Sequence, residues 1–225
     1  MKRYIPHLLS FNAGYVDTAG FMALQGLFTA HVTGNFVTLG AALVQGSSGV
    51  LAKLLALPVF CAVIVLARLA TASPRLSPRT PVRALMAAKL LLLTLGAVLA
   101  IRFGPFHQQG DSVQAVVTGM VLVAAMAIQN ALSRIHLATS PPTTLMTGST
   151  TQLMIDVADL LRGAGGDAAA ATRARLRKVG SVIATFAVGC AAGAAAFHLV
   201  DTWCFALPPL LALVTTLDAS FAPEA

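Results

Sequence analysis

Long apolar segments separated by short polar ones dominate the hydrophobic pattern of this chain. An α-helix rises about 1.5 Å per residue, so about 20 apolar residues cross the hydrocarbon core of a bilayer. Six segments reach or approach that length, at residues 8–27, 53–72, 82–101, 113–133, 179–199 and 203–219. The pattern therefore predicts an all-α integral membrane protein with six transmembrane helices.

Two further apolar segments, residues 34–46 and 148–161, are too short to cross a bilayer. A polar triplet, Thr-Gly-Asn or Thr-Gly-Ser, opens each of them. The stretches that contain these triplets, residues 28–35 and 142–149, resemble each other and lie about half a chain apart. A duplicated, interrupted apolar segment is typical of transporters built from two repeats. Each half is expected to carry one re-entrant or broken half-helix.

Composition and charge set the expected topology. Only 10% of the residues are charged and 57% are apolar, whereas a soluble domain carries roughly 25% charged residues. The net charge of +7 comes from cations near the N-terminus and in the loops 73–83 and 162–178, so we expect no nucleic-acid partner. Positive loops stay in the cytoplasm. The three clusters of cations lie on the same side of the membrane only if the short segments 34–46 and 148–161 do not cross it. We therefore expect six crossings, with both termini in the cytoplasm.

Three crossings per half make the predicted repeat inverted, within a single membrane domain of residues 1–225. Repeat 1 covers about residues 1–105 and repeat 2 about residues 106–225. The N-termini of the two half-helices would then meet near mid-membrane, where their free N–H groups and partial positive charge favour an anion. The predicted substrate-binding residues are Thr33, Gly34, Asn35, Thr147, Gly148, Ser149 and Thr150. Simple helix capping is the alternative, because Ser, Thr and Asn are common N-caps.

Asp17 is an acidic residue well inside an apolar span. Intramembrane carboxylates are costly and are functional candidates by default, so Asp17 is predicted to bind a proton or a cation, or to anchor a cationic group of a substrate. A structural ion pair with an Arg or Lys is the alternative. Gln129 and Asn130 fall at the equivalent place in the second half, allowing one inserted residue. His31 titrates near neutrality and is either a proton-handling group or an interfacial loop residue. The predicted coupling residues are therefore Asp17, His31, Gln129 and Asn130.

Other polar and small residues have local interpretations. Lys89 is expected to snorkel to the cytoplasmic interface, with pairing to Asp17 as the alternative. Gly189 and Gly193 belong to a four-residue spacing of small residues that favours close helix packing inside the protein over a dimer face. Asp156 is predicted to belong to a solvated, salt-bridged helix end. The histidines show no metal-ligand spacing and no nucleotide-binding or nucleophile motif occurs, so we expect no metal, no cofactor and no enzymatic activity.

Residues 14–17, with the sequence Gly-Tyr-Val-Asp, residues 28–35 and the second Thr-Gly at Thr147 and Gly148 resemble the YoaK-like family of bacterial membrane proteins. The resemblance runs almost end to end. It implies a six-helix protein of the bacterial inner membrane. The family is a domain of unknown function, so the resemblance implies no substrate and no catalytic residues.

The leading functional hypothesis is a small secondary transporter or exporter of a small, anionic solute, with proton coupling through Asp17. Six spans are few for a transporter, so a homodimer in the lipid bilayer is expected. One alternative is a non-transporting membrane module, such as an assembly partner or a sensor. A passive channel is the other alternative, although the spans 82–101 and 179–199 are too apolar to favour a continuous polar lumen.

Overall fold

The structure is a computed structural model that describes residues 4–72, 79–106, 111–137, 140–144, 146–163 and 165–218. All regular secondary structure in these ranges is helical, which confirms the all-α prediction. The elements are α1 (Ile5–Ala23), α2 (Gly34–Gln45), α3 (Val50–Thr71), α4 (Arg79–Phe103), α5 (Val113–Ile135), α6 (Met146–Leu161), α7 (Gly166–Val200), the 3-10 helix η1 (Asp201–Ala206) and α8 (Leu207–Leu217).

Several of these helices have the length and composition of membrane spans. Among the described residues, four helical stretches are long and apolar enough to cross a bilayer: Val50–Thr71, Thr80–Phe103, Val113–Ile135 and Gly166–Leu217. These apolar helices identify a membrane protein. The six predicted spans coincide with α1, α3, α4, α5, α7 and the η1–α8 pair, but a crossing by each of them stays a prediction.

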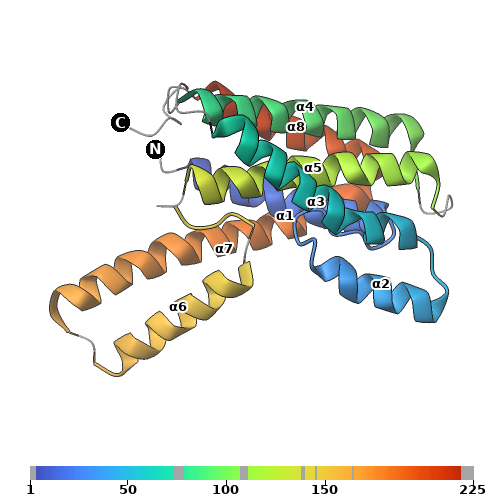
Figure 1. Ribbon diagram of the computed structural model, residues 1–225. Coiled ribbons are helices and arrows are strands. Elements are labelled where there is room, and N and C mark those ends of the chain that lie inside the picture. The colour runs from blue at the N-terminus through green and yellow to red at the C-terminus, as the bar shows by residue number, and fades with distance from the viewer. Residues whose placement is uncertain are drawn as a thin grey trace.

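Two helices form the centre of the molecule. The buried residues of α1 and α5 include Tyr15, Leu122 and Met126 of the larger apolar core. Helix α1 packs most extensively on α7, and α5 packs on α4 and α3. In Figure 1, α4, α5, α8 and α1 run along the body of the molecule, while α2 and the α6–α7 pair project from it in different directions.

Glycines allow α1 and α7 to touch along their backbones. A Cβ atom on Gly189 would lie 2.2 Å from the carbonyl oxygen of Phe11, and one on Gly193 would lie 2.5 Å from that of Tyr15. Neither distance leaves room for a side chain. The prediction that this four-residue spacing serves internal packing is therefore confirmed.

The two short helices occur where the sequence predicts them. Helix α2 has 12 residues and α6 has 16, and each is followed directly by the long helix on which it packs, α3 or α7. Much of their outer surface is apolar and exposed, as Val37 and Val44 of α2 and Leu161 of α6 illustrate. Such faces suit contact with lipid.

An ion pair joins α6 to α7. Arg175 donates to the two carboxylate oxygens of Asp156, Nε to Oδ2 and Nη2 to Oδ1, both at 2.6 Å. Asp156 is buried, so the prediction of a solvated helix end is wrong for this residue: its partner lies on the next helix. Several cations of the predicted topology, Lys2, Arg3 and Arg75, lie outside the described residues.

Candidate functional site

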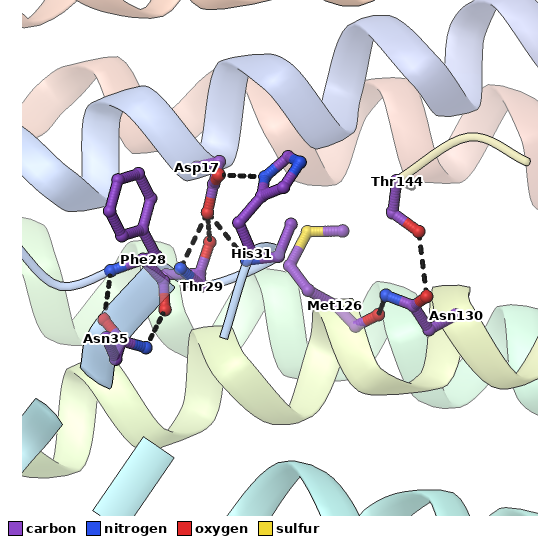
Figure 2. A network of polar contacts seen from close by, with 9 residues as sticks. Asp17, Phe28, Thr29, His31, Asn35, Met126, Asn130 and Thr144 are labelled. Atoms are coloured by element: carbon purple, nitrogen blue, oxygen red, sulfur yellow. Dashed lines mark hydrogen bonds and ion pairs between the residues drawn. The ribbon is translucent and has the colours of Figure 1, made fainter. Parts of the chain in front are cut away.

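The Asp17 carboxylate holds the segment between α1 and α2. Its Oδ1 accepts the backbone N–H groups of Thr29 and Ala30, both at 2.7 Å, and the Thr29 hydroxyl at 3.3 Å. Its Oδ2 lies 2.6 Å from Nδ1 of His31 (Figure 2). Asp17 is only 4% exposed. A buried carboxylate in a membrane protein requires such donors, and here four of them surround it.

A turn in the backbone after α1 brings residues 24–33 back to Asp17. Helix α1 ends at Ala23, and Gln25 and Gly26 then adopt positive φ angles of 56° and 84°, which turn the chain. At the other end of the segment, the Asn35 side chain accepts from the backbone N–H of Phe28 and donates to its carbonyl oxygen, both at 2.8 Å (Figure 2). Asp17 and Asn35 together fix the path of residues 24–33.

The N-terminus of α2 satisfies its own donors. Its first amide groups bond to carbonyl oxygens of the preceding residues: Gly34 N to His31 O at 2.8 Å, Asn35 N to Val32 O at 3.1 Å and Phe36 N to Thr33 O at 3.2 Å. A Cβ on Gly34 would lie 2.9 Å from the Phe28 ring, so this glycine makes room for the ring. Gly34 and Asn35 therefore have structural roles here, Thr33 is exposed, and substrate binding by all three stays a prediction.

The second half contains an equivalent cluster with uncharged groups. Asn130 Oδ1 accepts the Thr144 hydroxyl at 2.9 Å, and Gln129 Nε2 donates to the Thr143 hydroxyl at 3.0 Å and to the Leu9 carbonyl at 2.9 Å. Figure 2 shows the Asn130–Thr144 bond of this cluster together with the contacts of Asp17. The alignment of Asp17 with Gln129 and Asn130 thus corresponds to a shared position, since each binds the segment before a short helix.

Lys89 joins the second cluster rather than the first. Its Nζ donates to Gln129 Oε1 at 2.5 Å, and the residue is 1% exposed. Both predictions for Lys89 are therefore wrong: it does not reach the membrane interface, and Asp17 is not its partner. An amide oxygen is its hydrogen-bond acceptor in the described part of the chain.

The predicted residues at the start of α6 lie elsewhere. Thr147, Gly148 and Thr150 are exposed, and Ser149 is half-buried. Thr147 and Thr150 line an open, shallow groove along one face of α6. The structure thus does not bring these residues together with Thr33, Gly34 and Asn35 in one enclosed site, and their role in substrate binding stays a prediction.

A cavity of about 430 Å³ lies beside the Asp17–His31 pair. Its lining residues are Asp17, Thr18, Phe21, Phe28, His31, Phe186 and Cys190. They come from α1, from the segment before α2 and from α7. The rings of Phe21 and Phe28 lie 4.8 Å apart, and the ring of Phe186 meets that of His31 edge-on at 5.3 Å. We name this space the Asp17 cavity.

The sequence identified the ionisable members of the Asp17 cavity but missed its aromatic wall. Phe21 follows Asp17 by four residues, and Cys190 follows Phe186 by four, so each pair shares a helix face. That spacing was a usable signal within each helix. Nothing local in the sequence indicates that the face with Phe186 meets the face with Asp17, because α7 lies in the other half of the chain.

The family model described as "Protein of unknown function (DUF1275)" matches residues 5–217. The chain belongs to the DUF1275 family. This agrees with the YoaK-like resemblance of residues 14–17 and 28–35. No curated protein and no solved structure matches the chain.

The chemistry of this DUF1275 protein must therefore be argued from its own residues. Within the described ranges, no group of three His, Cys, Asp or Glu residues is placed to hold a metal ion. The Asp17 cavity combines a carboxylate, an imidazole and three phenyl rings. An imidazole with one nitrogen fixed by a carboxylate gains or loses its second proton at the other nitrogen. This arrangement is suited to reversible protonation next to an apolar ligand.

Proposed function

We propose that this protein is a proton-coupled secondary carrier of a small solute, with Asp17 and His31 as the coupling pair. The observation that carries the proposal is the position of this pair in the wall of a cavity of about 430 Å³. Ligand pockets typically measure roughly 300–1,000 Å³. An ionisable pair that is buried, hydrogen-bonded and in contact with such a space can link the binding of a solute to the binding of a proton.

A packing pattern that an inverted repeat would produce supports the proposal. Let α1–α4 form one repeat and α5–α8, with η1, the other, so that α1 corresponds to α5, α2 to α6, α3 to α7 and α4 to α8. Each principal packing pair then has a counterpart: α1 on α7 and α5 on α3, α4 on α5 and α8 on α1, α2 on α3 and α6 on α7. Carriers with such repeats expose a central site alternately by moving one repeat against the other.

The Asp17 cavity lies at the contact between the two proposed repeats. Asp17, Phe21 and His31 come from the first, whereas Phe186 and Cys190 come from α7 of the second. A movement of α7 along α1 would therefore change the wall of the cavity directly.

Proteoliposomes that enclose a pH-sensitive dye test the proposal. Inorganic anions, carboxylates, amino acids and organic cations are added outside, and protein-free liposomes correct for passive leakage. We expect one solute class to drive proton movement with wild-type protein and not with Asp17→Asn or His31→Gln. Thr144→Val is the matched control, because it removes a hydrogen bond in the equivalent segment of the second half and no titratable group.

Two results contradict the carrier. Solute uptake without proton movement removes the coupling role of Asp17 and His31. Absence of both proton movement and solute uptake with every solute class, in protein that is monodisperse and thermally stable, removes the transport activity and favours the non-transporting membrane module.

A further inference from the structure

We infer that the Asp17 cavity binds a small monocarboxylate with an apolar or aromatic body, taken up as the anion together with one proton on His31. This inference rests on the proposed carrier function and specifies its substrate class. Three features of the cavity support it: the occupied carboxylate of Asp17, the free Nε2 of His31 and the wall of phenyl rings.

The Asp17 carboxylate is already held by four donors and offers little exposed surface to a cationic ligand. Its oxygens already accept from Thr29, Ala30 and His31, and its side chain is 6% exposed. An ammonium group would have to displace the imidazole to reach it. The two backbone N–H groups also stabilise the negative charge, since charge-assisted bonds of this kind are among the strongest in proteins.

His31 presents the free polar atom. Its Nδ1 faces Asp17, its side chain is 32% exposed, and its Nε2 has no hydrogen-bond partner among the described residues. Because Nδ1–H donates to the carboxylate, the second proton of the ring goes to Nε2. A protonated Nε2–H is a strong donor for a carboxylate ligand.

The rest of the cavity favours one charged group and an apolar body. Three phenyl rings, those of Phe21, Phe28 and Phe186, form most of the wall. The remaining polar groups are the Thr18 hydroxyl and the Cys190 thiol, which leave a second carboxylate without a cationic partner. Burial of an unpaired charge is costly, so dicarboxylates are disfavoured.

Binding of the anion should therefore take up a proton. The titratable groups that face His31 are Asp17 from α1 and Cys190 from α7, and the described lining of the cavity holds no other. Asp17 stabilises the imidazolium, and the carboxylate of the ligand stabilises it further. Above the pH at which His31 titrates, each bound anion brings one proton, and the affinity falls about tenfold for each pH unit.

Isothermal titration of the purified protein in detergent tests this inference with benzoate as the probe. Titrations at pH 6 and pH 8, in buffers of different ionisation enthalpy, count the protons taken up. Benzylamine and benzyl alcohol share the ring of benzoate but are a cation and a neutral molecule, and phthalate adds a second carboxylate. We expect benzoate to bind best, with more proton uptake at pH 8 than at pH 6.

Two variants locate the binding. His31→Gln keeps an N–H donor but cannot titrate, so proton uptake and the pH dependence of benzoate affinity should both disappear. Phe186→Ala should weaken benzoate more than acetate, because only benzoate has a ring to contact it. Thr144→Val, in the second cluster, should bind as the wild type does.

The outcomes separate this inference from the carrier proposal. Tighter binding of benzylamine, equal binding of benzyl alcohol, or unchanged proton uptake in His31→Gln would overturn the inference. If benzoate does not bind while another solute drives protons in proteoliposomes, the inference fails and the carrier stands. If benzoate binds with proton uptake and no solute drives protons, the carrier fails and the site chemistry stands.

Discussion

The segments that precede α2 and α6 are each held by a polar side chain of the preceding long helix, but with different chemistry. Asp17 of α1 accepts two backbone N–H groups and an imidazole. Asn130 of α5 accepts a single hydroxyl, that of Thr144. The first segment is therefore held through the charge of a carboxylate, the second through neutral hydrogen bonds.

The surroundings of the two clusters also differ, because one cluster borders a cavity and the other is closed. The Asp17 cluster opens onto a cavity, and its imidazole forms part of the cavity wall. In the second cluster Gln129 is 0% exposed and bonds to Lys89, so this part is closed. The cluster around Asp17 thus borders a cavity, whereas the part of the second cluster around Gln129 is closed.

The largest expected effect comes from alanine at the two equivalent positions. Asp17→Ala leaves the N–H groups of Thr29 and Ala30 and the His31 imidazole without their acceptor. A buried donor left without its acceptor costs about 1–3 kcal/mol, and this change leaves the N–H groups of both Thr29 and Ala30 unpaired. Asn130→Ala removes one bond to a hydroxyl and should cost about 1 kcal/mol. Unfolding of the two variants in mixed micelles by a denaturing detergent measures the difference.

Asp17→Asn serves as the control for this comparison. Its amide oxygen can still accept the N–H groups of Thr29 and Ala30, so it should recover a large part of the lost stability without restoring proton coupling. Equal costs for Asp17→Ala and Asn130→Ala would contradict the difference in chemistry between the two halves.

The two short helices were predictable because their signals are local. A glycine flanked by polar residues interrupts an apolar run, and the segments 34–46 and 148–161 accordingly begin and end within two residues of α2 and α6. The position of Asp17 within an apolar span is likewise visible in the amino-acid pattern alone, as are the amides at the equivalent place in the second half.

The partners of these residues were not predictable in the same way. Lys89 bonds to Gln129, 40 residues away, and Asp156 bonds to Arg175, 19 residues away. Sequence spacing indicates which residues share a helix face over one or two turns. It does not indicate which two helix faces meet, and burial then decides whether a cation reaches water or needs an internal acceptor.

The second-largest loss of stability is expected in the closed part of the second cluster, around Gln129. Gln129→Leu removes the acceptor of the buried Lys89 ammonium, and hydrogen bonds to charged groups contribute about 1.5–3 kcal/mol. Adding Lys89→Met removes the orphaned charge and should restore much of the lost stability. Such a double variant is more stable than the single one when the two side chains interact. The same unfolding assay measures both, and additive losses would contradict a direct Lys89–Gln129 contact.

The smallest expected effect is on the contacts of α2 with α3 and of α6 with α7. The α6–α7 pair contains the Asp156–Arg175 ion pair, whereas the described residues of α2 and α3 form none. The Arg175 guanidinium lowers the pKa of Asp156 below its ordinary value. The carboxylate therefore stabilises the contact above the ordinary Asp pKa of about 4, and this contribution is lost as the pH falls through the lowered pKa.

Acid should thus loosen α6 and leave α2 unchanged, which spin-label distances from α6 to α7 and from α2 to α3 can follow. Asp156→Asn should show the loosened α6 at neutral pH, and an acid response that persists in this variant would assign it to another group.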